Sequence, residues 1–592
     1  MPIWKKSPER KSRLKSYKRI FSYFRQYKKY AILAPITVSI EVLLEIWIPY
    51  LMADIIDVGI ANKDVAYVIR TGGLMVLTAL VSLAFGAIAG RCGAMASTGL
   101  VRNVRKSLFD KVQDFSFSNI DHFSTPSLIT RMTTDLNYVQ NSVQMIVRML
   151  FRGPLMMVAA TFMTFRINPE LAVIYLIAIP LLGGTIAFIS IKAHPHFVAM
   201  FDRYDKLNGT VQENLIGIRV VKSFVRRDHE NGKFIRSATD VLEEALKAEK
   251  FVTLNGPIMQ LTVNSCIIAL LWFGGKRIII GNMQAGELIS FINYTNQILI
   301  QLMMLSMVLV TVIISRAAIK RILEVLDEKI DLDDVNADPN LVPENGEVRF
   351  DHVSFNYTSR KDASDMTLTD IDFDLKSGEL VGIIGGTGVG KSTLVQLIPR
   401  LYDVSEGAVL VGGNDVRDYK LKTIRDAVAI VLQKNVLFTG TIRENLLWGN
   451  EHASDEEIIE ACRSAQAHDF IMSFPDGYDT ELTQGGTNVS GGQKQRLCIA
   501  RALLKKPKVL ILDDSTSAVD TATDARIRKA FRERHNHITT IIIAQRITSV
   551  MDADKIIVLD EGRVDAIGTH EELIKSNRIY REVYESQQKG AE

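Results

Sequence analysis

The chain has 592 residues, more than the roughly 250–300 at which a single hydrophobic core stops growing, so at least two domains are expected. A net charge of only +3 gives no sign of a nucleic-acid-binding protein. The 4 cysteines fall in no metal-ligand spacing and form no disulfide framework, which excludes a zinc module and a disulfide-stapled secreted domain.

Residues 1–30 are rich in Lys and Arg, and apolar side chains recur among them at helical spacing. These are Leu14, Tyr17, Ile20, Phe21, Phe24 and Tyr27. The pattern predicts a basic amphipathic segment that lies on the cytoplasmic membrane surface. The alternative is a solvated basic tail, against which the aromatic stripe argues. No apolar region with a small-residue cleavage site follows, so no cleaved signal peptide is expected.

Residues 31–328 contain six apolar segments of about 20 residues, the length needed to cross a bilayer. They lie near 31–52, 71–93, 143–165, 170–191, 251–275 and 287–315. The two long connections, 94–142 and 192–250, are basic and have helical patterns, so we expect helical extensions inside the cell. The alternative, a soluble helical bundle, does not explain the consistent charge asymmetry between the connections.

Polar side chains within these spans are costly, so each is a candidate for the transport path. Glu41 and Glu45 lie on one helix face and suggest cationic, amphipathic substrates. Possible partners and further candidates are Arg91, Arg148, Arg152, Asn293, Asn296, Gln297, Gln301, Met303, Met304 and Met307. Ordinary packing between helices is the alternative role for all of them.

After a polar linker, residues 329–345, the chain changes to a soluble α/β pattern over 346–592. The stretch 385–393, GGTGVGKST, follows an apolar strand and opens a helix, as a P-loop requires. Its glycines let backbone N–H groups turn towards phosphate oxygens. Lys391 is placed for the β- and γ-phosphates and Ser392 for Mg²⁺. A chance glycine-rich turn is the alternative.

Further motifs follow in the second half of the chain. They are Tyr357 after a strand, Gln433 at the end of 430–433, the segment 488–496 (NVSGGQKQR), the strand 509–514 with Asp513 and Asp514, Ser517 to Asp520, and Gln545 after the strand 540–544. The P-loop alone would permit a kinase or a GTPase. With Ser490-Gly-Gly-Gln493 about 100 residues later, the set resembles the ATP-binding cassette (ABC) family, and its exporters in particular.

This resemblance implies the fold class and the roles of the residues. The fold is a membrane all-α domain of six helices with long intracellular extensions, fused to an α/β P-loop nucleotide-binding domain. ATP would contact Tyr357, Gly385, Gly386, Thr387, Gly388, Val389, Gly390, Lys391, Ser392, Thr393, Ser490, Gly491, Gly492, Gln493 and Asp520. Mg²⁺ would lie at Ser392, Gln433 and Asp513, and the catalytic positions would be Gln433, Asp514 and Gln545. Tyr357 would stack on adenine, unless it is simply a sheet-edge tyrosine.

The sequence departs from the family pattern at three places. Active members carry Glu where this chain has Asp514, and one methylene less leaves the carboxylate about 1–1.5 Å short, a misplacement that can cost about 10²-fold. They carry His where this chain has Gln545, whose amide cannot become cationic. An acidic-basic pair usually precedes the signature, where Gln484 and Gly485 stand here.

Together with the family resemblance, these departures predict a subunit of a heterodimeric, multidrug-type exporter in the cytoplasmic membrane. The basic connections 94–142 and 192–250 predict that both termini and the ATP-binding domain are cytoplasmic. Its own site would bind ATP but hydrolyse it poorly, and its signature would complete the competent site of a non-identical half-transporter. Membrane lipid and a small-molecule substrate are the other expected partners, and nucleic acid is not. The alternatives are a homodimeric lipid or peptide exporter and a non-catalytic, ATP-binding regulatory subunit.

Overall fold

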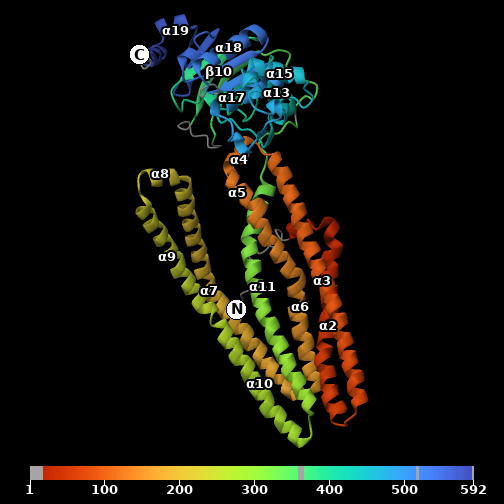
Figure 1. Ribbon diagram of the computed structural model, residues 1–592. Coiled ribbons are helices and arrows are strands. Elements are labelled where there is room, and N and C mark those ends of the chain that lie inside the picture. Colours follow the sequence, from red (N-terminus) through yellow and green to blue (C-terminus); the bar gives the residue numbers. More distant parts are fainter. Residues whose placement is uncertain (1–17, 336, 358–365, 515–518, 590–592) are drawn as a thin grey trace. The chain divides into compact units, whose positions relative to one another are not determined.

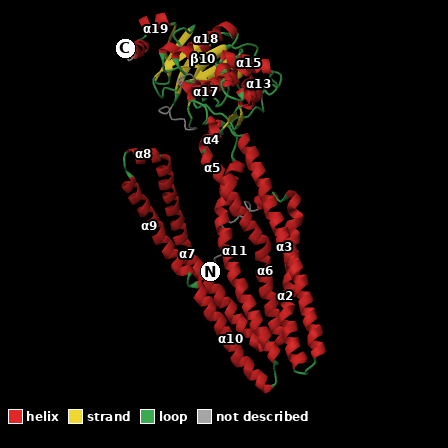
Figure 2. Ribbon diagram, in the orientation of Figure 1, coloured by secondary structure: helices red, strands yellow, loops and turns green. Residues whose placement is uncertain are grey.

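The protein is described here by a computed structural model that covers residues 18–335, 337–357, 366–514 and 519–589. The chain divides into two compact units: residues 1–113 with 125–328, and residues 114–124 with 329–592. The described part of the first unit is helical, and the named strands all belong to the second (Figure 2).

The first unit consists of long helices joined by short connections (Figure 1). Its elements are η1 (Arg25–Tyr27), α2 (Lys28–Asp54), η2 (Ile55–Ile60), α3 (Val65–Gln113), α5 (Thr125–Thr130), η3 (Arg131–Asp135), α6 (Leu136–Ile167), α7 (Pro169–Ile216), α8 (Ile218–Ser223), α9 (Arg227–Val252), α10 (Asn255–Ile280) and α11 (Ala285–Asp327). α7 and α9 run side by side, and the short α8 joins them at one end (Figure 1).

The described residues include six helical stretches that are long and apolar enough to cross a membrane, which confirms the expected number. Large apolar side chains remain exposed along them, including Trp47 at 56%, Leu83 at 69% and Phe162 at 64%. A helix that is apolar on its outward face as well as its inward face is typical of a membrane span. The basic extensions also form as expected, because α3, α7 and α9 continue as helices well beyond the apolar segments.

The described end of the N-terminal basic segment packs against the helices of its own unit. Ile20 and Phe24 are buried, at 0% and 8% exposure. Asn103 on α3 donates a hydrogen bond to the carbonyl of Tyr23 at 2.8 Å. Leu14 and Tyr17 lie outside the described residues, so the predicted membrane-surface location of this segment stays a prediction.

A buried ion pair joins η3 to α11. Asp135 is 0% exposed, and its two carboxylate oxygens accept hydrogen bonds from Arg321 Nε at 2.8 Å and from Arg321 NH2 at 2.5 Å. Two parallel bonds of this kind fix the relative orientation of the two helices as well as their distance. Removing one partner would leave the other charge without compensation.

We therefore expect Asp135→Asn to lower the free energy of unfolding of the first unit by about 3 kcal/mol. This value is at the lower end of the range for breaking a buried ion pair, because the Arg321 guanidinium is half-exposed. The measurement is the thermal unfolding midpoint of the purified chain in detergent. The double variant Asp135→Leu with Arg321→Leu should recover most of the loss, because it leaves no unpaired charge. An unchanged midpoint in Asp135→Asn would show that the pair carries no stability.

The second unit contains a six-stranded sheet in the order β12-β11-β3-β10-β9-β6 and a four-stranded sheet in the order β2-β1-β4-β5. The strands are β1 (Val348–Phe355), β2 (Leu368–Leu375), β3 (Leu380–Gly385), β4 (Glu406–Val411), β5 (Asn414–Asp415), β6 (Val428–Val431), β7 (Gly440–Thr441), β8 (Glu481–Leu482), β9 (Val509–Asp513), β10 (Thr539–Ile543), β11 (Lys555–Asp560) and β12 (Arg563–Gly568). In the larger sheet β11, β3, β10, β9 and β6 are parallel, so their carboxyl ends meet at one edge.

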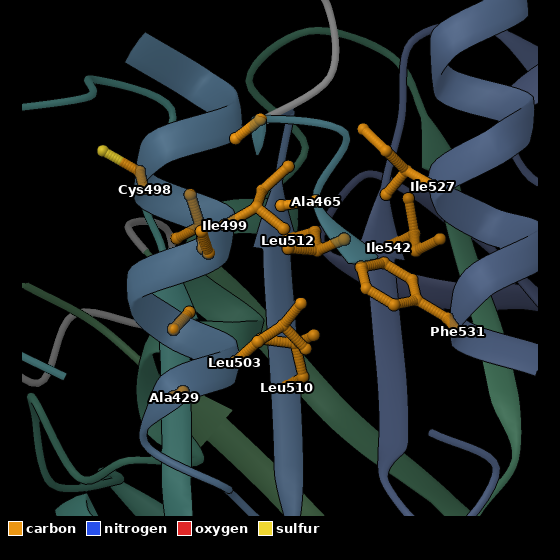
Figure 3. Packing of buried hydrophobic residues seen from close by; sticks show 14 of the residues in the cluster. Ala429, Ala465, Cys498, Ile499, Leu503, Leu510, Leu512, Ile527, Phe531 and Ile542 are labelled. Carbon is orange, nitrogen blue, oxygen red and sulfur yellow. The ribbon is translucent and has the colours of Figure 1, made fainter. Parts of the chain in front are cut away.

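Helices of this unit pack on the sheet and on one another, and together they bury its apolar faces. They are α12 (Lys391–Leu397), α13 (Leu421–Ala427), α14 (Ile442–Leu447), α15 (Asp455–Ser464), α16 (His468–Met472), α17 (Gly491–Leu504), α18 (Thr521–Arg534), α19 (His570–Ser576) and α20 (Arg578–Lys589), with the short turns η5 (Gly477–Asp479), η6 (Gln484–Gly486) and η7 (Ile547–Ser549). Figure 3 shows Leu510 and Leu512 of β9 packed beside Leu503 of α17 and Phe531 of α18. This core fixes the strand ends from which the polar residues project.

The short helix α4 (Phe117–Phe123) belongs to the second unit although it lies between α3 and α5 in the chain. A capping box between Ser116 and Asn119 begins it. The Ser116 hydroxyl also donates to Asp331 at 2.9 Å, and the Asn119 amide donates to the carbonyl of Lys329 at 2.9 Å. These bonds hold α4 to the segment that enters the nucleotide-binding part of the chain.

Candidate nucleotide-binding site

The loop from Gly385 to Gly390 joins β3 to α12 and has the backbone geometry of a phosphate cradle. Gly388 and Gly390 adopt φ angles of +85° and +92°, which non-glycine residues rarely adopt. A Cβ at Gly390 would also lie 2.8 Å from the Leu368 side chain, so that position has no room for a larger residue. Left-handed glycines of this kind turn successive N–H groups to one side.

Lys391 and Ser392 begin α12 and lie in the loop. Lys391 Nζ donates to the carbonyls of Gly385 and Gly386 at 2.8 and 2.6 Å. Both acceptors are neutral, so the ammonium charge is available to a phosphate. The Ser392 hydroxyl donates to Asp513 Oδ1 at 2.9 Å. This bond joins the P-loop to the end of β9.

Asp514 follows β9 and lies between two glutamines from the neighbouring strand ends. Its Oδ2 accepts a hydrogen bond from Gln545 Nε2 at 2.9 Å and another from Gln433 Nε2 at 3.3 Å. Gln433 follows β6 and Gln545 follows β10, and these strands lie on either side of β9. The Asp514 backbone has a φ of +47°, in a region that aspartate tolerates better than most residues.

The two carboxylates at the end of β9 are buried, with Asp513 at 3% and Asp514 at 9% exposure. Burial raises the pKa of Asp513, and the neighbouring Asp514 carboxylate raises it further, while the Ser392 hydroxyl acts in the opposite direction. Burial also raises the pKa of Asp514, against the hydrogen bond from Gln433 and the charge of Lys391. Burial lowers the pKa of Lys391, against the charges of both aspartates. A site of this kind gains from a bound cation.

The donor set fits Mg²⁺ when the ion is shared with a nucleotide. Ser392 and Asp513 offer adjacent hard oxygen ligands, which Mg²⁺ prefers. Within the described ranges, no three His, Cys, Asp or Glu side chains cluster so as to hold a metal by themselves. Mg²⁺ usually binds through one or two protein oxygens and completes its shell with phosphates and water.

Tyr357 is hydrogen-bonded to the end of the P-loop, and 47% of the residue is exposed. Its hydroxyl shares a 3.0 Å hydrogen bond with Thr393. Its ring meets Phe355 and Tyr402 edge to face, at centroid distances of 4.9 and 5.1 Å. This packing fixes the ring in a position from which a flat base can stack on it.

Tyr402 links this aromatic cluster to α4, and the sequence patterns did not indicate that role. Its hydroxyl donates to Asp121 Oδ2 at 2.8 Å, and its ring contacts Phe117 at a centroid distance of 6.1 Å. Burial and the Asp121 carboxylate both raise the pKa of Tyr402, so the hydroxyl keeps its proton and remains a donor. Tyr357 and α4 are therefore separated by a single side chain, that of Tyr402.

Removing the Tyr402 hydroxyl should increase local opening of α4 without affecting the rest of the domain. A hydrogen bond to a charged group at a partly exposed site contributes about 1 kcal/mol, so Tyr402→Phe should raise amide hydrogen exchange in residues 117–123 about fivefold. Tyr419→Phe is a matched control, because that hydroxyl donates to the Val411 carbonyl at 2.7 Å and has no bond to α4. Equal exchange in both variants would contradict the link.

The signature segment starts a separate helix. Ser490 caps α17: its hydroxyl accepts from Gln493 N at 3.3 Å, and its own N–H donates to Gln493 Oε1 at 2.8 Å. Gly491 and Gly492 form the first turn of α17, where free N–H groups favour an anion. Arg496 follows, donating to the Gly492 carbonyl at 3.3 Å and stacking over Phe470 at 4.6 Å.

The predicted residues thus form two groups in this chain. Hydrogen bonds connect Ser392 with Asp513, and Gln433 and Gln545 with Asp514. None of the hydrogen bonds between described residues joins Ser490 or Gln493 to that group. Asp520 caps α18 by accepting from Thr523 N at 2.9 Å, and Ser517 lies outside the described residues. The departures at Gln484 and Gly485 fall in η6, where Gly485 has a φ of +70°.

Comparison with known proteins gives matches over both units. The family model for the ABC transporter transmembrane region matches residues 31–303, and the model for the ABC transporter ATP-binding domain, described as "ABC transporter", matches residues 368–517. An uncharacterized ABC transporter ATP-binding protein of Bacillus subtilis is 38% identical over 566 residues, which cover 96% of this chain and 98% of that protein.

The chain belongs to the ABC transporter family.

Other members of the ABC transporter family agree with this assignment. An ATP-dependent lipid A-core flippase of Syntrophus aciditrophicus is 33% identical over 82% of this chain and 80% of its own length. The solved structure of a bacterial Atm1-family ABC exporter with ATP bound matches with a TM-score of 0.79 and 26% identity, covering 95% of this chain and 98% of that one. This ABC transporter is therefore an exporter-type half-transporter, a multi-pass membrane protein whose ATPase domain implies ATP binding coupled to transport.

Proposed function

We propose that this chain is the ATP-holding, slowly hydrolysing subunit of a heterodimeric exporter for amphipathic small molecules. Its P-loop binds ATP, and its signature segment completes a competent site on a non-identical half-transporter. The nucleotide-binding domains and both termini lie in the cytoplasm, as the basic connections 94–142 and 192–250 indicate. Substrate leaves the cell through the cytoplasmic membrane.

The observation that carries this proposal is the arrangement around Asp514. Its carboxylate is one methylene shorter than glutamate, and Oδ2 already accepts two amide N–H groups. Neither amide takes up a proton at neutral pH, so Gln433 and Gln545 cannot relay one from an attacking water. Asp514 is held towards the strand ends, and a carboxylate that falls short of an attacking water loses about 10²-fold in rate.

The remaining residues fit the binding of ATP without its cleavage. Lys391 brings an unpaired positive charge to the loop, and Ser392 with Asp513 would hold Mg²⁺, which supplies charge stabilisation to the phosphates when bound. Tyr357 presents its ring to the base. On the other side of the dimer, Ser490, Gly491 and Gly492 offer a hydroxyl and N–H groups to the γ-phosphate of the partner's ATP.

A homodimeric lipid exporter is the second candidate, and the resemblance to lipid A-core flippases favours it. The two candidates share every motif in the nucleotide-binding domain. They differ in the identity of the second chain and in the number of working ATP sites. A regulatory subunit without transport is the third candidate, and it shares the arrangement around Asp514.

Isolation of the complex from its native membrane separates the three candidates. We expect mass spectrometry to find one non-identical half-transporter per copy of this chain. Inverted vesicles containing that complex should accumulate a fluorescent amphiphile only when ATP is added. A complex of identical chains would contradict the heterodimer, and ATP-independent flux would favour the regulatory or channel-like subunit.

A further inference from the structure

A hollow of about 570 Å³ lies among α2, α3 and α6, within the membrane-spanning helices. Its charged lining consists of Glu41 and Glu45 from α2 and of Arg148 and Arg152 from α6. The α3 side contributes small residues, including Gly86 and Gly90. Charges inside spanning helices are costly and usually mark a functional site.

Arg152 forms ion pairs with both glutamates. One of its terminal nitrogens binds Glu41 Oε1, and the other donates to Glu45 Oε2 at 2.6 Å. The predicted pairing of Arg152 with carboxylates inside the bundle is confirmed. One guanidinium is shared by two carboxylates, so this group of three side chains keeps one net negative charge.

Arg148 lies one helical turn from Arg152 and has no such partner. Among the residues that the structure describes, none forms an ion pair with it, and its Nε is buried without a hydrogen bond. A Cβ at Gly90 would lie 3.9 Å from its NH1 atom, so the guanidinium lies against α3 at that position. The hollow therefore contains one positive group with unused hydrogen-bond donors.

Glu41 supplies the opposite kind of group. The residue is 9% exposed, and its Oε2 is buried without a hydrogen-bond partner, although Oε1 is bound by Arg152. A Cβ at Gly86 would lie 2.9 Å from Glu41 Oε1, so a larger residue at position 86 would displace this carboxylate. Gly86 and Gly90 are four residues apart on α3, so the two unsatisfied groups are separated by about 6 Å along that helix.

Two unsatisfied groups of opposite charge in one hollow fit a ligand that carries both charges. With two glutamates and two arginines the lining is neutral overall, so it gives no net attraction to a purely cationic or purely anionic ligand. We propose that this hollow binds the zwitterionic headgroup of an amphiphile, with its ammonium group at Glu41 Oε2 and its phosphate or carboxylate at Arg148. The inference rests on the proposed exporter function and names the substrate class that it takes.

The test is a binding titration of the purified full-length chain in dodecyl maltoside, an uncharged detergent, without nucleotide. Three probes share one dansyl-labelled hydrocarbon chain: lysophosphatidylethanolamine, lysophosphatidylglycerol, whose phosphodiester carries a single negative charge, and an alkylammonium. We expect the zwitterion to bind at least about tenfold tighter than either singly charged probe, the gain of one charge-assisted contact in a buried site. Equal affinity for the cationic or the anionic probe would overturn the proposal, as would binding of none.

Substitutions in the lining of the hollow test which side chains contact the zwitterionic probe. Arg148→Gln should lower the affinity for the zwitterion to that of the cationic probe, and Arg148→Lys should keep part of the preference. Arg70→Gln is the matched control, because Arg70 is on α3 but does not line the hollow, and it should change nothing. Gly86→Ala should weaken the binding of the zwitterion, because the added methyl group displaces Glu41. A zwitterion preference that survives Arg148→Gln would place the ligand elsewhere.

A fourth probe distinguishes two sources of the same chemistry. An α-amino acid with a dansyl-alkyl side chain carries both charges without phosphate. Binding of both zwitterions indicates a general zwitterion site, and binding of the phospholipid probe alone restricts the ligand to lipid headgroups. The titration uses no nucleotide, so it tests ligand binding independently of ATP hydrolysis. If no probe bound, the proposed slow hydrolysis at this chain's site would be unaffected. If that hydrolysis proposal were wrong, the measured preference for a zwitterion would still hold.

Discussion

Replacing Asp514 with glutamate should raise the rate of ATP hydrolysis at this chain's own P-loop by about 10²-fold. The added methylene moves the carboxylate outwards, away from the amides of Gln433 and Gln545 that now hold it at 3.3 and 2.9 Å. The carboxylate can then reach a water in line with the γ-phosphate.

The measurement needs a complex in which only this site hydrolyses ATP. Gly491→Asp in the same chain provides it, because in the proposed heterodimer Gly491 belongs to the signature that completes the partner's site and not to this chain's P-loop group. Phosphate release is then compared between Gly491→Asp alone and Gly491→Asp with Asp514→Glu. Asp514→Asn is the control of similar size and should give no gain. If glutamate and asparagine gave the same rate, the length of Asp514 would not limit hydrolysis.

The signature variant itself should have the second large effect. Gly491→Asp places a carboxylate on the first turn of α17, where the γ-phosphate of the partner's ATP would meet free N–H groups. Losing such donors to a developing charge costs about 10²–10³-fold, so hydrolysis by the assembled complex should fall by at least 10²-fold. Lys391→Met disables this chain's own P-loop and serves as the counterpart.

The comparison of these two variants shows which of the two ATP sites accounts for most of the hydrolysis. We expect Lys391→Met to lower the hydrolysis of the complex far less than Gly491→Asp does, because the proposed division of labour assigns the P-loop of this chain to the slow site. Trinitrophenyl-ATP binding should confirm that Gly491→Asp leaves the P-loop of this chain able to bind nucleotide. Equal losses in the two variants would mean that both sites hydrolyse ATP, as in a symmetric exporter.

The sequence indicated the parts of the site that are local along the chain. The P-loop and the six apolar spans each follow from spacing within a short segment, because glycine φ angles and hydropathy are local properties. The family resemblance then supplied the roles of Gln433 and Gln545 as contacts for Mg²⁺, water or phosphate. Those two roles stay predictions.

The sequence did not indicate contacts that depend on which strands are neighbours. Gln433 and Gln545 both donate to Asp514 because β6 and β10 lie on either side of β9, and strand order is not readable from the separate motifs. The bond between Tyr402 and Asp121 joins residues 281 positions apart, and no spacing rule brings them together. The ion pairs of Arg152 with both Glu41 and Glu45 were not readable from the sequence either, because they depend on how α2 and α6 pack.

The division of labour between two different half-transporters can be tested by measuring ATP turnover of this chain alone, reconstituted in lipid. We expect the solitary chain to bind trinitrophenyl-ATP in a Lys391-dependent manner and to release phosphate at a rate near background. Rapid, sustained hydrolysis by the solitary chain, accompanied by uptake of an amphiphile into the vesicles, would contradict this division of labour.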